Sequence, residues 1–96
     1  MIRVPVADGT LAVWSAGSGP AIIFLHGGPG DTHDYMCRMA EPLLSRFRCV
    51  LFDQRGTGQS NDFPRAAEKY SVVALLEDLK AIVRTLDLAR PALVGH

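Results

Sequence analysis

The chain has 96 residues, the size of one domain or of part of one. Hydrophobic residues make up 48% of it and charged residues 21%, which argues against an intrinsically disordered segment. Ten basic and ten acidic residues give a formal net charge of zero, so no excess of positive charge is present to attract nucleic acid or anionic lipid.

The first predicted elements form a hairpin followed by a buried strand. Residues 3–6 and 11–16 are short apolar stretches on either side of Asp8-Gly9, a pair typical of tight hairpin turns. Residues 21–25 are apolar at every position, as expected of a strand that is buried on both faces of a parallel sheet. This apolar run is far shorter than the roughly 20 residues of a membrane helix. The N-terminal residues do not resemble a signal peptide, and we expect no membrane partner.

A helical segment is predicted next, between residues 35 and 47. Its apolar residues recur at spacings of one, three and four, and Asp31 and Thr32 are plausible N-caps. Pro42 lacks an N–H, so we expect it to divide the segment into two short helical pieces. Residues 49–52 then form a second predicted buried strand.

The clearest predicted helix begins after Ser71, a typical N-cap residue. Its expected buried face carries Val72, Leu75, Leu76, Leu79, Ile82, Val83 and Leu86. Its expected solvent face carries Glu77, Asp78, Lys80 and Arg84. Residues 92–94 begin a third predicted buried strand, which gives the element order β-β-β-α-β-α-β. This order is typical of an α/β sheet with right-handed crossovers.

Two glycine-rich loops, residues 26–30 and 53–60, each follow a predicted strand directly. In a parallel sheet, ligands bind beyond the carboxyl ends of the strands, so both loops should lie on the functional face. A dinucleotide site is one interpretation of the first loop. However, the loop lacks G-x-G-x-x-G spacing, and Pro29 removes an N–H that a pyrophosphate would need. A phosphate loop would also need Gly-Lys-Ser/Thr, which is absent there.

The twin glycines of the first loop favour an oxyanion hole instead. Such a site needs fixed backbone N–H donors about 2.7–3.1 Å from an oxygen that becomes negative in the transition state. Two adjacent glycines let the backbone approach the reacting carbon without a Cβ in the way.

The two loops resemble the paired motifs of α/β-hydrolases of the proline iminopeptidase (prolyl aminopeptidase) type. The motifs are His26-Gly27-Gly28-Pro29-Gly30 and Asp53-Gln54-Arg55-Gly56-Thr57-Gly58-Gln59-Ser60. The resemblance covers residues 1–96 as the N-terminal segment of a single α/β-hydrolase domain. It implies a mostly parallel sheet of about five strands in the order 1-2-4-3-5, with helices on both faces.

The same resemblance implies serine-dependent hydrolysis of an ester or amide, with release of N-terminal proline from peptides as the leading activity. It places the oxyanion-hole N–H on Gly28, with Gly27 as its neighbour. It implies a small peptide or ester as the substrate. We expect no cofactor and no metal, and the cysteine usage predicts a cytoplasmic location. The other motif residues are expected to shape the loops: His26, Pro29, Gly30, Asp53, Gln54, Arg55, Gly56, Gly58, Ser60, Gly95 and His96.

The end of the chain is similar to the start of a nucleophile elbow, G-x-S-x-G. Gly95 would be the first glycine and His96 the residue before the serine. The family order Ser, Asp or Glu, His then places the whole triad beyond residue 96. We therefore expect the 96-residue chain alone to be inactive, with at most an association role. The apolar strand from residue 92 is expected to be an exposed edge that pairs with a second copy or with a complementing C-terminal segment.

The histidines have structural interpretations besides reactive ones. His26 precedes the expected position of the family's nucleophile, opposite to the family order, which favours a role in bracing its loop. His33 with Asp31 and Asp34 suggests a metal site, but cap or surface roles also explain these residues.

The other polar candidates also have structural interpretations. Ser15 and Ser60 are nucleophiles by residue type only, because neither lies in a G-x-S-x-G context. Asp53 could be a catalytic acid, but a carboxylate at a glycine-rich turn more often accepts local backbone N–H groups. Arg55 is expected to fix its loop as a cation.

The cysteines and methionines are predicted to pack. Cys37 and Cys49 have no Cys-x-x-Cys spacing, which fits a reducing compartment, and they fall on a predicted helix and a buried strand. Met36 and Met39 are expected in the core.

Overall fold

The structure, a computed structural model, describes residues 1–27, 32–64 and 71–95. The elements in chain order are β1 (Ile2–Val6), β2 (Gly9–Ala16), β3 (Ala21–Leu25), η1 (His33–Met36), α1 (Cys37–Ala40), η2 (Glu41–Leu43), β4 (Arg48–Phe52), α2 (Val72–Thr85) and β5 (Ala92–Gly95). Among these described residues, no helix combines the length and the apolar character that a membrane span requires.

The five strands form one sheet in the order β1-β2-β4-β3-β5, as predicted. β2 pairs antiparallel with β1 and with β4, whereas β3 pairs parallel with β4 and with β5. Among the described strands of this mixed sheet, only β2 therefore runs against the others. The predicted hairpin turn is present, and Asp8 has a φ of 76°, which Asp tolerates better than most residues.

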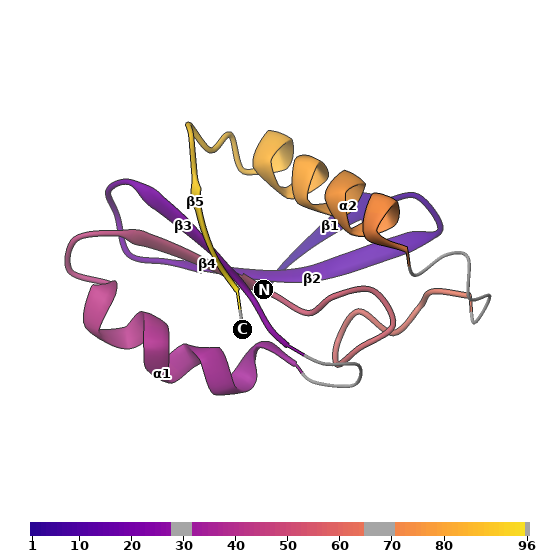
Figure 1. Ribbon diagram of the computed structural model, residues 1–96, viewed down its shortest axis with the longest axis horizontal. Coiled ribbons are helices and arrows are strands. Elements are labelled where there is room, and N and C mark those ends of the chain that lie inside the picture. Colours follow the sequence, from indigo (N-terminus) through magenta and orange to yellow (C-terminus); the bar gives the residue numbers. More distant parts are fainter. Residues whose placement is uncertain (28–31, 65–70, 96) are drawn as a thin grey trace.

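The apolar residues of strands β3 and β4 are buried because each face of these strands packs against a helical segment. α2 covers one face of the sheet and α1 the other (Figure 1). Ile23 and Val50 belong to the core under α2, whereas Phe24 and Leu51 belong to the core over α1. The connection from β3 to β4 and the connection from β4 to β5 move in opposite directions across the sheet. Right-handed crossovers then place their helices on opposite faces, as predicted.

The segment between β3 and β4 is divided into three short helical pieces, η1, α1 and η2. The predicted interruption is present, and Pro42 lies in η2 with its missing N–H near the start of that piece. Met36 is fully buried, but Met39 is 45% exposed, so the prediction that Met39 lies in the core was wrong. The buried side of α1 follows the i, i+4 step from Met36 to Ala40, which leaves Met39 outside it.

Helix α2 begins at the predicted cap, where the Ser71 hydroxyl accepts the Ala74 N–H at 3.1 Å. The prediction of its buried and solvent faces was wrong at three residues. Asp78, expected in solvent, is 1% exposed, while Val72 and Leu76, expected in the core, are exposed. Asp78 lies four residues before the buried Ile82, so the helical period itself places this charge on the buried side.

Strand β5 lies at the end of the sheet, because its only strand partner among the described residues is β3. Its central residue Leu93 is 55% exposed. Residues 92–94 are therefore an exposed edge in this structure rather than a strand buried on both faces.

Candidate functional site

The first residues of the two glycine-rich loops lie side by side because they leave neighbouring parallel strands at their carboxyl ends. His26 directly follows β3, and Asp53 directly follows β4. Four residues of the first region, Gly28, Pro29, Gly30 and Asp31, lie outside the described residues, as does His96. The assignment of the oxyanion donor to Gly28 stays a prediction.

His26 joins the first loop to the second. Its buried ring accepts the Gln54 backbone N–H at Nε2 over 2.9 Å, and the Gln54 side-chain amide donates to the His26 carbonyl over 2.6 Å. Because Nε2 is an acceptor here, the ring proton of a neutral imidazole lies on Nδ1, which is 3.3 Å from the Gly27 carbonyl oxygen. The ring therefore braces two loops and is not placed to take a proton from a substrate.

Gly27 has a partner within the fold. Its backbone N–H donates to the Tyr35 hydroxyl, which η1 brings back to the turn. The family resemblance places Gly27 beside Gly28 in the oxyanion hole. That assignment stays a prediction, with the Gly27 N–H directed to the Tyr35 hydroxyl in this structure.

Asp53 is the centre of the second loop. Its buried carboxylate accepts the His33 backbone N–H at 2.7 Å and the Gln59 backbone N–H at 2.9 Å, and it lies 2.8 Å from His33 Nδ1. Burial by itself raises the pKa of Asp53, but the hydrogen bonds from Gln59 and His33 outweigh it, so the pKa lies below its ordinary value of 3.8. Asp53 is thus an ionised carboxylate that organises the loop.

The lowered pKa of Asp53 predicts a loss of stability in acid. A carboxylate whose pKa is lower in the folded state stabilises the fold fully above its unfolded-state pKa, and this contribution disappears as the pH falls through the folded-state pKa. We expect the free energy of unfolding, measured by urea denaturation from pH 7 to pH 3, to fall below about pH 4. The Asp53→Asn variant is expected to be less stable at pH 7 and to show a shallower fall.

The acid dependence of the free energy of unfolding can be compared with that of a matched control variant. Glu41→Gln changes an exposed carboxylate and should keep the wild-type slope. A residual slope in Asp53→Asn is expected, because hydrogen bonds from Thr10 also lower the pKa of Asp62. An unchanged acid slope in Asp53→Asn would contradict the role assigned to this carboxylate.

His33 and Trp14 form a contact that the sequence does not predict. Their rings are stacked, with centroids 3.6 Å apart and an angle of 18° between the planes. The ring of His33 also approaches the exposed Asp34 carboxylate at 3.3 Å. Within residues 1–27, 32–64 and 71–95, no group of three His, Cys, Asp or Glu side chains is placed to hold a metal ion. His33 therefore serves as a partner of Asp53 and Trp14 rather than as a surface residue.

Arg55 connects the second loop to the rest of the fold. Its buried guanidinium donates to both carboxylate oxygens of Asp78 on α2, at 2.8 Å and 2.7 Å. It also donates to the Ala7 carbonyl at 3.3 Å and lies 4.7 Å from the centroid of the Phe63 ring. One side chain thus links the loop, α2 and the β1–β2 turn.

The glycines of the second loop are required by its shape. Gly56 and Gly58 have φ values of 78° and 47°, in the left-handed region that disfavours larger side chains. A Cβ at Gly58 would lie 2.3 Å from an oxygen of Asp53. The close approach of this backbone to the carboxylate explains the need for glycine.

The two candidate serines are engaged in structural hydrogen bonds. The fully buried Ser60 hydroxyl accepts the Ala12 N–H at 2.8 Å and donates to the Asp53 carbonyl at 2.7 Å. The Ser15 hydroxyl accepts the Arg48 Nε–H at 2.9 Å. Neither contact pattern is that of a nucleophile activated by a base.

The two cysteines differ in exposure, and Gly95 lies at the end of the last strand. Cys49 is buried as predicted, and burial raises the pKa of its thiol. Cys37 is exposed, so the prediction that it packs was wrong. Gly95 ends β5, and a Cβ added there would meet no heavy atom within 4 Å among the described residues. Its position fits the end of a strand before a turn.

Comparisons with known proteins connect this geometry to one family. The family described as "alpha/beta hydrolase fold" matches residues 20–96. The crystal structure of a proline iminopeptidase-related protein from Thermus thermophilus superposes with a TM-score of 0.90 at 38% identity, covering 98% of this chain and 34% of that protein. A fluoroacetate dehalogenase from Burkholderia sp is 38% identical over 97% of this chain and 31% of its own length. An epoxide hydrolase from Vigna radiata superposes with a TM-score of 0.89 at 29% identity, covering 99% of this chain and 30% of that protein. The chain thus spans about a third of the length of these relatives.

Proposed function

The chain belongs to the alpha/beta hydrolase family, and from this premise we propose that it supplies the oxyanion-hole side of a serine hydrolase that cleaves esters or amides. The leading substrate is a peptide with an N-terminal proline. The proposal combines the His-Gly-Gly-Pro-Gly motif with the similarity to the proline iminopeptidase-related protein from Thermus thermophilus.

One observation carries the proposal most directly. The turn that holds the twin glycines starts at the carboxyl end of β3, and His26 and Gln54 fix it to the loop after β4 through two hydrogen bonds. An oxyanion hole stabilises a transition state only if its donors are held in place before the reaction. The two hydrogen bonds of His26 support the proposal, because they hold the residue from which this segment begins.

The proposed mechanism divides the work between this chain and residues that follow the elbow. A serine after Gly95-His96 attacks the scissile carbonyl, and a histidine takes its proton and passes it to the leaving group. The Gly28 N–H donates to the oxygen that becomes negative. The carboxylate of Asp53 takes no part, because His33 and Gln59 already occupy it.

A second candidate is displacement of a leaving group from a saturated carbon. The names of the Burkholderia and Vigna relatives, a fluoroacetate dehalogenase and an epoxide hydrolase, favour it, since their similarity also covers nearly all of this chain. The displacement step of such a reaction does not create an oxyanion at a carbonyl. That step would not require the N–H donor assigned to Gly28, which separates it from the first step of the first candidate.

The coding sequence gives the first experiment. If the proposal is right, the codon after His96 encodes serine and glycine follows two codons later. The protein from the complete reading frame is then expected to release p-nitroaniline from proline p-nitroanilide more efficiently than it releases fluoride from fluoroacetate or opens styrene oxide. A stop codon after His96, or preference for either of the other two substrates, would contradict the proposal.

We also propose that residues 1–96 alone do not hydrolyse these substrates. The reason is that no triad member is assigned to these residues, and loss of nucleophile and base leaves little of the rate enhancement. Purified chain, assayed with proline p-nitroanilide and p-nitrophenyl acetate, is expected to match the rate in buffer. Turnover that is abolished by a serine-directed inhibitor would show that the chain contains its own nucleophile.

A further inference from the structure

A cavity of about 310 Å³ opens between strand β2 and the helical segment that contains α1, and we call it the α1–β2 cavity. Apolar side chains make most of its wall, namely Trp14 and Ala16 on β2, Leu51 on β4 and Leu44 just after η2. Trp14 and Ala16 point to the same face of the sheet because they alternate along the strand. Sites for small organic molecules are mostly apolar and begin at about 300 Å³, so this cavity has the size of a small one.

Three polar side chains of the helical segment also line the cavity, namely His33, Cys37 and Glu41. They are four residues apart along η1, α1 and η2, which brings them to one side of the segment. Both ring nitrogens of His33 already face carboxylates, with Asp53 at 2.8 Å and Asp34 at 3.3 Å. Cys37 and Glu41 are exposed, and Glu41 is the charged group left to meet a ligand.

The charge at the cavity favours a cation. Within the described part of the chain, the Glu41 carboxylate takes part in no ion pair, and no lysine or arginine lines the cavity. Arg48 at the start of β4 is turned to the other face of the sheet, where it donates to the Ser15 hydroxyl at 2.9 Å and to the Leu86 carbonyl at 3.3 Å. A bound anion would therefore meet a carboxylate without a basic partner.

We propose that the α1–β2 cavity binds a small apolar amine. Its ammonium group pairs with the Glu41 carboxylate, and its hydrocarbon part packs on Trp14 and Leu51. Burial of the hydrocarbon supplies most of the binding free energy, and the carboxylate selects the charge of the ligand. This inference goes beyond the proposed function, because no step of that hydrolysis uses these side chains.

The cavity is remote from the exposed edge of the sheet. In the strand order β1-β2-β4-β3-β5, β2 lies toward one end of the sheet and β5 forms the other. The cavity also lies on the face covered by α1, whereas α2 covers the opposite face (Figure 1). A polypeptide that pairs with β5 would therefore add to the sheet at the far end from this cavity.

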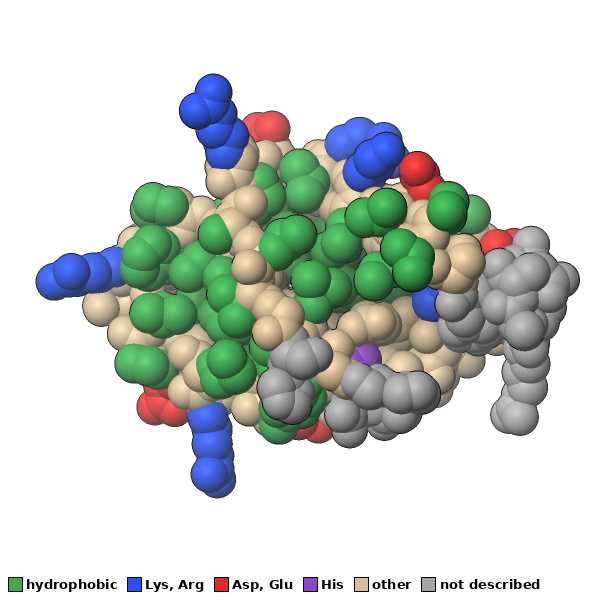
Figure 2. Space-filling view, in the orientation of Figure 1, with side chains coloured by type: hydrophobic (Ala, Val, Ile, Leu, Met, Phe, Trp, Pro, Cys, Tyr) green, Lys and Arg blue, Asp and Glu red, His purple; other side chains and the backbone are tan. Residues whose placement is uncertain are grey.

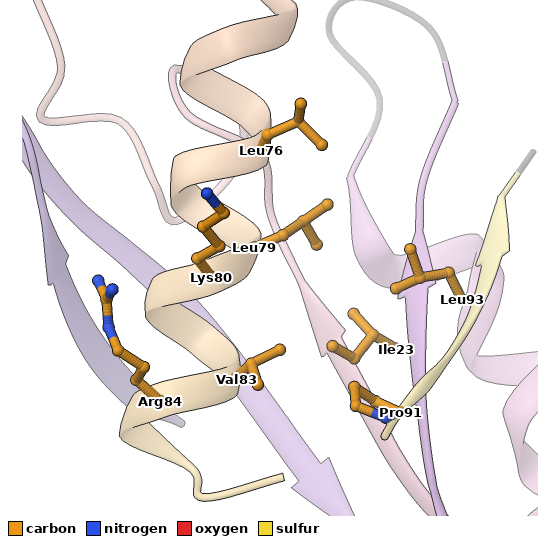
Figure 3. Close-up of a pocket in the computed structure, with 8 residues that line it drawn as sticks. All are labelled: Ile23, Leu76, Leu79, Lys80, Val83, Arg84, Pro91 and Leu93. Carbon is orange, nitrogen blue, oxygen red and sulfur yellow. The ribbon is translucent and has the colours of Figure 1, made fainter. Parts of the chain in front are cut away.

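A second apolar cavity, between α2 and β5, has the opposite charge. Leu76 on the helix points toward Leu93 on the strand across a space of about 370 Å³ (Figure 3). Hydrophobic side chains gather over this side of the molecule (Figure 2). Lys80 and Arg84 also line this space, and no acidic side chain among the described residues does. An amine is therefore expected to prefer the α1–β2 cavity, and the charge of the ligand distinguishes the two places.

The single tryptophan of the chain, Trp14, gives a direct signal for the test. The full 96-residue chain is titrated with phenethylamine, with its neutral isostere 2-phenylethanol and with 3-phenylpropionate, while Trp14 emission is recorded. We expect phenethylamine to bind about fivefold more tightly than 2-phenylethanol, the effect of one exposed ion pair. We expect 3-phenylpropionate to bind most weakly of the three. Added salt should narrow the difference between the amine and the alcohol.

Cys37 provides a second signal, which shows where the ligand lies. Its thiol is exposed at the cavity, whereas Cys49 is buried. At about ten times its Kd, phenethylamine should slow alkylation of Cys37 by iodoacetamide about tenfold, as measured by peptide mass mapping. The same measurement applies to the protein from the complete reading frame. An unchanged alkylation rate despite saturable binding would place the ligand elsewhere and overturn the proposal.

Three variants test the roles of the lining residues. Glu41→Gln should bind phenethylamine no more tightly than 2-phenylethanol. Glu77→Gln removes an exposed carboxylate on α2 and should bind like wild type. Ala16→Phe adds a ring inside the cavity and should abolish saturable binding of both the amine and the alcohol. Because Ala16 is exposed, its fold should survive, as checked by circular dichroism.

Several results would overturn the proposal. Equal affinity for the amine and the alcohol, or unchanged amine affinity in Glu41→Gln, would remove the preference for a cation. Tightest binding of 3-phenylpropionate would identify an anion site instead. Absence of both the Trp14 signal and the protection of Cys37 would show that the cavity binds none of these molecules. A complete protein that binds phenethylamine here but cleaves no ester or amide would count against the proposed function and leave this site intact.

Discussion

Replacing Asp78 with alanine is expected to lower the free energy of unfolding by about 3–5 kcal/mol. The guanidinium of Arg55 is buried, and Asp78 satisfies two of its donors at 2.8 Å and 2.7 Å. Removal of the carboxylate leaves a buried cation with the Ala7 carbonyl at 3.3 Å and with Asp8 at 4.0 Å. A domain of this size has roughly 0.05–0.15 kcal/mol of stability per residue, so the loss is a large share of the total.

The neighbouring carboxylate on the same helix is the natural control. Glu77 is exposed and contacts Lys80 only at 3.5 Å, so Glu77→Ala should cost less than about 1 kcal/mol. The double variant Arg55→Met/Asp78→Leu removes both charges and should recover part of the stability lost in Asp78→Ala. Urea unfolding monitored by circular dichroism measures all three. Similar losses for Asp78→Ala and Glu77→Ala would show that the buried ion pair does not hold this loop to α2.

Asp78 also shows where prediction from the sequence stops. The strands, the Ser71 cap and the two opposite faces follow from local patterns, because apolar runs and helical periods are properties of neighbouring residues. The burial of Asp78 depends on Arg55, which is distant in the sequence and enters the fold through a loop. A helical wheel places Asp78 above Ile82 on the buried side, but a charged side chain there is assigned to solvent unless its partner is known.

The candidate site also has features that the sequence predicts and features that it does not predict. The positions of the two loops follow from the alternation of strands and helices, since strand ends fix where a loop begins. The contacts inside the site do not follow, because His33, Trp14 and Asp53 come from three separate elements. The engagement of the Gly27 N–H by Tyr35 is also a tertiary contact that the local sequence pattern does not predict.

Replacing Gly28 with proline should therefore lower kcat by about 10²–10³ in the protein expressed from the complete reading frame. Proline removes the one N–H that the family resemblance assigns to the oxyanion. Because this bond strengthens only in the transition state, KM for proline p-nitroanilide should change much less than kcat.

Gly28→Ala separates the N–H from the shape of the turn. Alanine keeps the donor and adds only a methyl group, so a loss confined to Gly28→Pro assigns the effect to the N–H. Equal losses in both variants would instead mean that the turn tolerates only glycine. The same pair distinguishes the two candidate reactions at their first chemical step, because displacement at a saturated carbon generates no carbonyl oxyanion in that step. If fluoride release or epoxide opening is the activity found, Gly28→Pro should leave the rate of that step, measured in a single turnover, within a few-fold of wild type. A drop of about 10²–10³ on the amide substrate, with Gly28→Ala near wild type, is the result that only an oxyanion donor at this position explains.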